Sequence, residues 1–453
     1  MIGRTAELKN LANLYAKDGN QLVVLCGWKE SGKEELLQEF CKGKKVMYYQ
    51  TAAVSPKLQR QMMKEAVEKR YGITMSDDTY DTAFTRIRSG DSSKLILVIR
   101  DFEQVARKDK EFLDSIGRLM DKRLYPGPVM VLLCTSDVAW AEHEMMEELG
   151  SCARKVTDTV KVTELNFVDV VHMFPEASVS QCVQIYGILG GVPEYLKGWD
   201  AGSDLKANIC RHILSRDGYL YEEAEGFITR NLREPSVYNT ILAAVAAGKY
   251  KLNDLFLETG YARAKISVYM KNLIHLEVAE KLTSFETGGW ENSQKGLYHI
   301  RNTYLHFWYR FVFPRKSQLF VLGPESFYDT YVAPQMEEYL NDYFRKVCRE
   351  YLELMGKVRQ LPMEIHKMGT WVGKRGNIDI IAQNSVRENL VGLCNWSRPQ
   401  LSYDMYEGLL EAMGQARISA KQYYLFSARD FDERLREKAA EDDRIILVDM
   451  NNM

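Results

Sequence analysis

The stretch from Leu22 to Leu37 constrains the fold of this chain more than any other part of the sequence. It reads LVVLCGWKESGKEELL: an apolar run, a turn bounded by Gly27 and Gly32, then Lys33 and a helix-forming run. With the spacing G-x-x-x-x-G-K, the glycines let backbone N–H groups surround phosphates, while the lysine and the helix N-terminus add positive charge. The sequence therefore predicts a phosphate-binding loop, with Gly27, Gly32 and Lys33 as nucleotide-binding residues.

The residue after the lysine departs from this motif. Phosphate loops of this type carry Ser or Thr there, and the hydroxyl group binds Mg²⁺. This chain has Glu34 at that position. A nucleotide remains the expected ligand, with ATP as the candidate cofactor; a role for Mg²⁺ is doubtful, and nucleotide binding is better supported than hydrolysis.

Size and composition indicate a multidomain globular protein. The chain has 453 residues, which at about 150 residues per domain suggests roughly three domains. The net charge of -2 attracts no nucleic acid by itself, so a DNA contact would need a local basic patch. The eight cysteines form no C-x-x-C pair, which favours reduced thiols over a metal or disulfide framework. The N-terminus lacks the apolar core of a signal peptide, and no apolar run approaches the roughly 20 residues that span a bilayer; we expect a cytoplasmic protein without membrane contact.

Strands and helices alternate through the first third of the chain. An amphipathic helix is predicted up to about Ala16, and strands are predicted at 45–50, 95–99 and 129–134, with a helix at 56–71. This alternation predicts an α/β fold with a parallel sheet and a ligand at the carboxyl ends of its strands.

Several segments together resemble the archaeal-type P-loop ATPases of the AAA/STAND group. They are G-R-x-x-E-L from Gly3, the phosphate loop, the strand that runs into DFEQV, the polar turn after Leu133, LGGVPEYL at 189–196, and long stretches beyond Phe227. The resemblance implies that Arg4 lies in the segment near the adenine, and that Gly191 and Pro193 belong to a lid turn that closes over the base. A break between two packed helices is the alternative interpretation of that turn.

The resemblance also implies a division of the chain into five parts. They are a P-loop nucleotide-binding domain at 1–165, a helical lid at 166–235, a winged helix at 236–302, a connecting helix and linker at 303–330, and a restriction-endonuclease-like α/β domain at 331–453.

The end of the third strand departs from that family. Where family members have Asp-Glu-Phe, this chain has Arg100, Asp101 and Phe102. On this alignment Glu34 and Arg100 replace two neighbouring groups of the Mg²⁺ site, and we expect them to form a bidentate ion pair that occupies it. The alternative is a shift of one residue, which would make Asp101 the metal-ordering catalytic acid.

The middle of the chain offers a DNA-binding interpretation. Helix, helix, turn, helix and two short strands follow one another in the order of a winged helix-turn-helix. The residues expected to face DNA are Arg263, Lys265, Ser267, Tyr269, Lys271 and Lys295. Nearby acidic residues nearly offset this charge, so a packing or regulatory role is the alternative. Arg230 and Arg233 are candidates for an arginine finger, or for ordinary solvated or paired arginines. The aromatic run at 304–313 predicts a buried helix that Pro314 ends.

The C-terminal part retains one group of the nuclease site that the resemblance implies. Asp379 stands at the position of the metal-binding acid, whereas the Glu-x-Lys tripeptide is replaced by residues 393–395, LCN, and the acid of the first helix by Arg345. One carboxylate facing an arginine lacks the charge to bind a divalent ion and activate water. The prediction is an inactive nuclease fold, kept as an interaction or dimerisation surface.

Three functions remain in competition at this point. The first is an ATP-binding scaffold or regulator with impaired Mg²⁺-dependent hydrolysis, partnered by a protein or by a second copy of the chain. The second is an active ATPase with a DNA-linked role, and the third is a DNA-binding regulator that uses the winged helix. The replaced metal groups favour the first.

Overall fold

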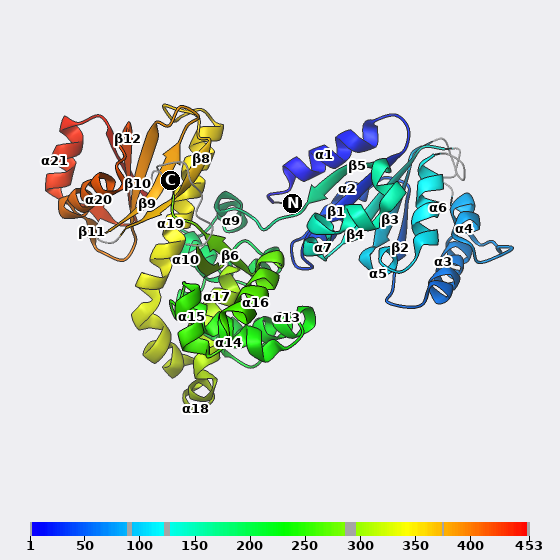
Figure 1. Ribbon diagram of the computed structural model, residues 1–453, viewed down its shortest axis with the longest axis horizontal. Helices are drawn as coiled ribbons and strands as arrows, with labels where there is room; N and C mark the ends of the chain where they lie inside the picture. The colour runs from blue at the N-terminus through cyan, green and yellow to red at the C-terminus, as the bar shows by residue number, and fades with distance from the viewer. Residues whose placement is uncertain (1, 88–92, 122–126, 286–295, 374–375, 451–453) are drawn as a thin grey trace. The chain divides into compact units, whose positions relative to one another are not determined.

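The computed structural model describes residues 2–87, 93–121, 127–285, 296–373 and 376–450 (Figure 1). The chain divides into two compact units. The N-terminal unit comprises residues 1–164 with 192–194, and the C-terminal unit comprises residues 165–191 and 195–453.

A five-stranded parallel sheet forms the centre of the N-terminal unit. Its strands have the spatial order β2-β3-β4-β1-β5. They are β1 (Gln21–Cys26), β2 (Val46–Gln50), β3 (Leu95–Arg100), β4 (Val129–Thr135) and β5 (Val156–Lys161). The predicted strands β2, β3 and β4 are confirmed to within one residue at each end.

Helices cover both faces of this sheet, because alternate residues of each strand enter different cores. Along β1, Leu22 and Val24 face one core, while Val23 and Leu25 face the other. The first core is completed by α3 (Pro56–Tyr71), α4 (Tyr80–Arg86), α5 (Glu103–Ala106), α6 (Lys110–Met120), α7 (Val138–His143) and α8 (Met145–Glu148). The second is completed by α1 (Thr5–Ala16) and α2 (Lys33–Cys41). Burial on both faces explains the continuous apolar runs of the central strands.

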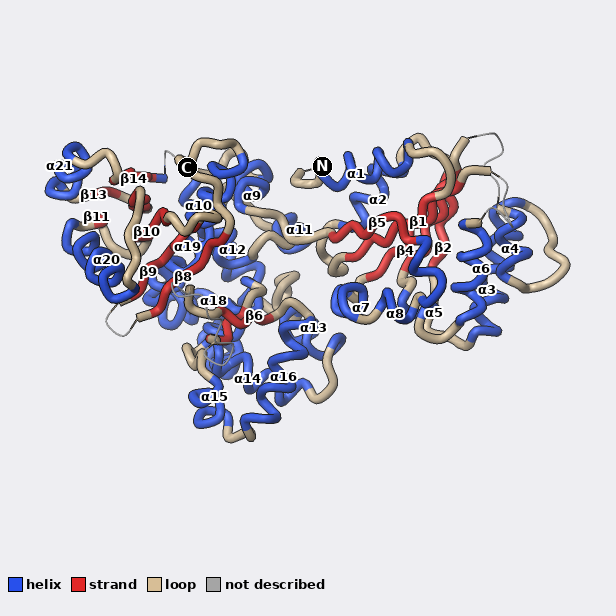
Figure 2. Tube along the Cα trace, turned by 45° about the horizontal axis from the view of Figure 1, so that its top comes forward, coloured by secondary structure: helices blue, strands red, loops and turns tan. Residues whose placement is uncertain are grey.

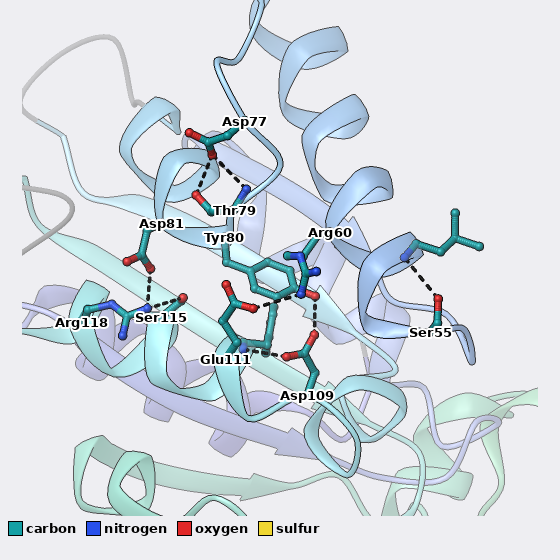
Figure 3. A network of polar contacts seen from close by, with 12 residues as sticks. Ser55, Arg60, Asp77, Thr79, Tyr80, Asp81, Asp109, Glu111, Ser115 and Arg118 are labelled. Carbon is teal, nitrogen blue, oxygen red and sulfur yellow. Dashed lines mark hydrogen bonds and ion pairs between the residues drawn. The ribbon is translucent and has the colours of Figure 1, made fainter.

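Polar contacts hold α3, α4 and α6 together (Figure 3). The buried Tyr80 hydroxyl donates to Asp109 Oδ2 over 2.9 Å, and Asp109 Oδ1 caps α6 by accepting the Phe112 N–H over 3.2 Å. At the surface, Arg60 pairs with Glu111 over 3.0 Å. These groups satisfy one another, which makes this cluster a structural one.

The first part of the C-terminal unit is helical. Its helices are α9 (Phe167–Met173), α10 (Val179–Leu189), the last three residues of α11 (Pro193–Lys197), α12 (Leu205–Ile209) and α13 (Glu223–Asn231). Three helices and a two-stranded antiparallel sheet follow in the predicted order: α14 (Pro235–Ala246), α15 (Leu252–Thr259), α16 (Arg263–His275), β6 (Ala279–Leu282) and β7 (Leu297–Ile300). The predicted wing around 286–295, including Lys295, lies outside the described residues.

The aromatic run is buried as predicted, and the helix through it ends just before Pro314, also as predicted. Helix α17 (Thr303–Phe307) continues through a π-helical turn, Trp308–Val312, and a separate 3₁₀ turn, Phe313–Arg315, holds Pro314 at its start, where a proline gives up no hydrogen bond. Arg315, with φ of -130° and ψ of 25°, then separates this turn from α18 (Lys316–Phe327). Helix α18 is interrupted at Gly323, whose φ is 72°, directly before Pro324.

A mixed five-stranded sheet ends the C-terminal unit, and its strands lie side by side in Figure 2. Its spatial order is β14-β12-β10-β9-β8, for β8 (Lys367–Val372), β9 (Asn377–Gln383), β10 (Asn389–Asn395), β12 (Gln422–Ser427) and β14 (Ile445–Asp449). Helices α20 (Tyr403–Ala416) and α21 (Glu433–Glu441) cover one face. The long helix α19 (Ala333–Lys357) packs on the other, with Tyr351 against Phe426 at 5.8 Å. The predicted α/β fold class, a parallel-sheet domain followed by helices and a C-terminal α/β sheet, is confirmed.

Candidate functional site

The predicted phosphate loop connects β1 to α2 at the carboxyl edge of the parallel sheet. Gly27 tolerates no side chain, because a Cβ there would lie 2.7 Å from the Val162 carbonyl oxygen. Gly32 caps α2 in the left-handed region, with φ of 82°, which glycine adopts without strain. A Cβ at Gly32 would lie 3.3 Å from Pro193 Cγ. The predicted lid proline therefore lies directly beside the second glycine of the loop.

The Lys33 side chain points into the protein and is only 3% exposed. Its ammonium group donates to three uncharged acceptors: the Gly27 carbonyl over 3.1 Å, the Thr135 carbonyl over 2.8 Å, and Ser136 Oγ over 2.7 Å. Burial lowers the pKa of Lys33, and nearby negative groups only partly oppose this. Since an ammonium has three N–H donors, Lys33 must give up these bonds before it contacts a phosphate.

Arg4 connects the phosphate loop to the segment after β5. Its Nη2 donates to the Ser31 carbonyl over 2.6 Å and to the Thr163 carbonyl over 2.7 Å, and its Nη1 pairs with Glu7 over 3.3 Å. The guanidinium group is therefore already hydrogen-bonded to the backbone of both segments. Contact between this segment and adenine stays a prediction.

The expected contact between Glu34 and Arg100 is present. Arg100 Nη2 lies 2.5 Å from Glu34 Oε2, which joins the first turn of α2 to the end of β3. The pair is half-buried: the Glu34 side chain is 42% exposed and the Arg100 side chain is 31% exposed. The Arg100 guanidinium also lies 5.2 Å from the centre of the Tyr48 ring. The bidentate form is wrong: Glu34 Oε2 and Arg100 Nε have no hydrogen-bond partner, so the contact is an ion pair without hydrogen-bond geometry.

Asp101 occupies a strained position next to this pair. Its φ is 49°, in the left-handed region. Its carboxylate accepts from the Gln50 side chain, and its carbonyl accepts from Thr51 Oγ1 over 2.6 Å. Asp101 is therefore tied to the end of β2, and its catalytic role stays a prediction.

Sequence reasoning missed an acidic residue near Lys33. Glu103, the first residue of α5, is only 7% exposed. Burial raises its pKa, while a hydrogen bond with Thr135 and the charge of Lys33 lower it in part. The signal that could have found Glu103 is its place in the sequence, two residues after Asp101 and so just beyond the end of a buried strand.

Comparisons with known proteins found a matching family, a relative and several solved structures. Residues 308–407 match a family described as archaea bacterial proteins of unknown function. An uncharacterized protein of Methanocaldococcus jannaschii is 24% identical over 389 residues, which cover 84% of each chain. A Walker-type ATPase of Pyrococcus abyssi is 15% identical with a TM-score of 0.48, covering 68% of this chain and 96% of that one. The ORC2 protein of Aeropyrum pernix, solved with ADPNP and ADP, is 12% identical with a TM-score of 0.44, covering 70% and 94%.

The parallel sheet of the N-terminal unit, with a strand, a loop bounded by two glycines and a helix at its carboxyl edge, is the arrangement that the sequence predicted for a P-loop domain.

Gly191, the other residue predicted to close over the base, lies in the C-terminal unit. Its carbonyl accepts the Leu165 N–H over 2.7 Å, and a Cβ at Gly191 would lie 1.8 Å from the Leu165 carbonyl oxygen. Two backbone segments pass too closely there for any side chain. Packing alone accounts for this glycine, and its contact with a base stays a prediction.

The predicted remnant of a nuclease site lies where α19 meets the mixed sheet. Asp379 Oδ1 accepts from Arg345 Nε over 2.9 Å, and Oδ2 accepts the Cys394 N–H over 2.9 Å. Arg345 Nη1 also donates to Asp342 over 2.9 Å. Burial lowers the pKa of Arg345, but the two carboxylates outweigh it and raise the pKa. In the part of the chain that the structure describes, no three His, Cys, Asp or Glu side chains converge as a metal site would need.

Three of the residues predicted to contact DNA or phosphate in the middle of the chain have partners within the protein. Arg263 donates to Asn253 over 2.5 Å and lies 4.0 Å from the centre of the Phe256 ring. Tyr269 donates to Glu234, and Arg230, one of the finger candidates, pairs with Glu223 over 3.0 Å. Arg233 and Lys271 are exposed. None of these contacts tests a DNA or nucleotide role, which stays a prediction.

Two further observations concern the cysteine thiols and the length of the helices. All eight cysteines are free thiols and are buried. Across the described residues, no helix combines the length and the apolar character needed to cross a bilayer.

Proposed function

We propose that this protein is an ATP-binding scaffold or regulator in which an ion pair between Glu34 and Arg100 takes the place of Mg²⁺. The observation that carries the proposal is the 2.5 Å contact between these two side chains, one on the first turn after the phosphate loop and the other at the end of β3. In the resemblance, the hydroxyl and the acid that hold Mg²⁺ stand at these two positions.

The chemistry of the pair supports nucleotide binding without efficient hydrolysis. Mg²⁺ bridges the β- and γ-phosphates and neutralises charge that develops as the terminal phosphate leaves. A guanidinium shared with a carboxylate carries no net positive charge to replace that cation. The loop glycines and the N-terminus of α2 remain available to bind phosphates, and Lys33 can join them once it exchanges its bonds to Gly27, Thr135 and Ser136. We therefore expect ATP affinity with little dependence on Mg²⁺, and slow turnover.

The test is calorimetric titration with ATP, in the presence of Mg²⁺ and of a chelator, for the wild type and Lys33→Ala. The proposal expects similar affinities in both conditions and loss of binding in Lys33→Ala. A many-fold gain in affinity from Mg²⁺, together with Mg²⁺-stimulated hydrolysis, would contradict it and favour the active ATPase. Absence of binding in both proteins would leave the loop as an architectural remnant.

The same proposal assigns the C-terminal sheet an interaction or dimerisation role in place of nuclease activity. Both carboxylate oxygens of Asp379 already accept hydrogen bonds, from Arg345 and from the Cys394 backbone. A carboxylate engaged in this way is a poor ligand for a divalent ion. DNA cleavage that requires a metal ion and disappears in Asp379→Ala would refute this part. The free, buried cysteines support a reducing, cytoplasmic setting.

A further inference from the structure

The ammonium group of Lys33 is fully hydrogen-bonded inside the protein. Its three acceptors are the Gly27 carbonyl at 3.1 Å, the Thr135 carbonyl at 2.8 Å and Ser136 Oγ at 2.7 Å. An ammonium has three N–H donors, so these contacts leave none for a ligand. A nucleotide phosphate can therefore gain Lys33 only in exchange for bonds that the protein already makes.

Strand pairing brings these acceptors together. The strands β1 and β4 are parallel neighbours, with Cys26 opposite Thr135. The phosphate loop after β1 and the polar turn after β4 therefore begin side by side. The Gly27 N–H donates to the Thr135 carbonyl over 3.3 Å, which connects the two backbones at this point. Ser136 follows directly, and its hydroxyl oxygen is the nearest of the three acceptors of Lys33.

The turn that carries Ser136 is held in place on both sides. Before it, Thr135 is fully buried, and its Oγ1 accepts the Asp137 N–H over 3.1 Å. After it, Asp137 Oδ1 accepts the Trp140 N–H over 3.0 Å and caps α7, while Oδ2 pairs with Arg107 over 2.9 Å. Because both neighbours are fixed, Ser136 stays in place when the ammonium group moves, and the bond between them breaks.

The chemistry of the acceptors makes this retention of Lys33 reversible. All three are uncharged, whereas a phosphate adds its own negative charge to a hydrogen bond with an ammonium group. A phosphate can thus displace them, but the retracted position lowers the observed affinity by the fraction of time that Lys33 spends there. Two of the acceptors are backbone carbonyls, which any residue supplies. Ser136 provides the one side chain among them, so its identity sets the strength of retention.

We propose that Ser136 is a positioning residue that holds Lys33 in the retracted position and so competes with the phosphates of a nucleotide for its ammonium group. The proposal rests on the nucleotide binding proposed above and names the residue that limits its affinity. The lysine of a phosphate loop reaches the β- and γ-phosphates. The competition therefore acts on ATP, and it leaves AMP, which lacks both of these phosphates, unaffected.

Removal of the Ser136 hydroxyl should tighten the binding of ATP. In Ser136→Ala the retracted ammonium group loses one of its three acceptors and keeps a buried N–H without a partner. Lys33 then spends more time at the phosphate position, and the affinity for ATP should rise by about tenfold. Ser136→Thr keeps a hydroxyl group, so it should behave like the wild type. A purely structural role for Ser136 would change the affinities for ATP and AMP alike.

The first experiment is calorimetric titration of the full chain with ATP and with AMP, each in the presence of Mg²⁺ and of a chelator. The proteins are the wild type, Ser136→Ala, Ser136→Thr, and Ser151→Ala as a control at an exposed serine. We expect tighter binding of ATP by Ser136→Ala alone, and no change in the affinity for AMP. Ser136→Cys, whose sulfur is a weak acceptor, should act in the same direction and replaces the alanine variant if that variant does not fold.

The second experiment follows the lysine itself, without nucleotide. A water-soluble N-hydroxysuccinimide ester acylates amino groups that reach the solvent, and mass spectrometry of the digested protein gives the rate at each lysine. We expect slow labelling of Lys33 in the wild type and in Ser136→Thr, and labelling several-fold faster in Ser136→Ala. Lys29, which is exposed in the same loop, is the internal reference and should react equally in all three proteins.

The outcomes separate this inference from the proposed function. If the wild type binds ATP and Ser136→Ala binds it no more tightly, the role of Ser136 is overturned and nucleotide binding stands. If neither protein binds ATP, both proposals are overturned. Equal labelling of Lys33 in the wild type and Ser136→Ala also overturns this inference. Binding of ATP by Ser136→Ala alone, with faster labelling of Lys33, supports it, because retention of the lysine then suppresses binding in the wild type.

Discussion

In each unit an arginine contacts a carboxylate at the place where the family resemblance puts a metal site, but the two contacts differ in depth. In the C-terminal unit, Asp379 is 13% exposed and accepts hydrogen bonds at both oxygens, from Arg345 and from the Cys394 backbone. In the N-terminal unit, Glu34 and Arg100 are 42% and 31% exposed and meet at one pair of atoms without hydrogen-bond geometry.

This difference indicates two kinds of replacement. A buried carboxylate with both oxygens bonded is part of the packing, and removal of its arginine leaves an uncompensated charge in the interior. A half-exposed ion pair is screened by water and contributes little to stability. We therefore regard the contact between Arg345 and Asp379 as part of the packed interior. The contact between Glu34 and Arg100 is one that a few substitutions can convert into a metal site.

The largest expected effect is that of Arg345→Met. It should lower the free energy of unfolding by about 3 kcal/mol, because the Asp379 carboxyl group is left in a buried position with only the Cys394 N–H as a partner. Urea denaturation of the full chain, followed by tryptophan fluorescence, measures the loss. A loss no greater than that of Arg100→Met would contradict the claim that the C-terminal contact is the more deeply built into the fold.

The second prediction concerns pH and the helix that carries Arg345. His306 Nδ1 lies 2.7 Å from the hydroxyl of Tyr343 on α19, and burial lowers the pKa of His306 to about 4. Since its folded pKa lies below the unfolded value near 6.5, its contribution is complete above about pH 6.5 and is lost as the pH falls towards 4. The slope is about 1.4 kcal/mol per pH unit for one proton.

The matched variants for this prediction are His306→Phe and His172→Phe, the latter at an exposed position. Unfolding by urea at several pH values should show a shallower loss of stability between pH 6.5 and 4 for His306→Phe, while His172→Phe follows the wild type. Burial also lowers the pKa of His299, so some slope persists in both. Parallel profiles for His306→Phe and the wild type would show that this histidine is not held neutral by the fold.

The smallest expected effect is that of Arg100→Met. The Glu34 side chain is 42% exposed and the Arg100 side chain 31% exposed, so removal of the ion pair should cost less than about 1 kcal/mol in the free energy of unfolding. The same urea experiment measures it beside Arg345→Met. A loss of several kcal/mol would mean that the N-terminal pair is as deeply built into the fold as the C-terminal one.

Local sequence signals predicted much of the fold. The helix at 56–71 was predicted to the residue, because Ser55 caps it, Pro56 fits its first position, and Gly72 ends it in the left-handed region. Strand β5 was not predicted, since Val156–Lys161 lies at the sheet edge, buries only Val160 fully and consists largely of polar residues. Edge strands carry too weak an apolar pattern to be separated from loops.

The candidate site was predicted only in part, and the reason is the distance along the chain between its members. Glu34 and Arg100 were paired because the resemblance supplies two neighbouring positions. No spacing rule connects Lys33 to Thr135, and no motif shows that Lys33 donates to the protein's own carbonyl groups. Such contacts depend on strand order, which brings the ends of β3 and β4 beside the loop after β1.

The most direct test of the account is to rebuild the metal site and measure its response to Mg²⁺. In the double variant Glu34→Thr with Arg100→Asp, the hydroxyl and the acid of the motif return together. We predict that Mg²⁺ leaves the ATP affinity of the wild type nearly unchanged and strengthens that of the double variant by about tenfold or more, or about 1.4 kcal/mol. Equal responses to Mg²⁺ in the two proteins would contradict the claim that this ion pair stands in place of the metal.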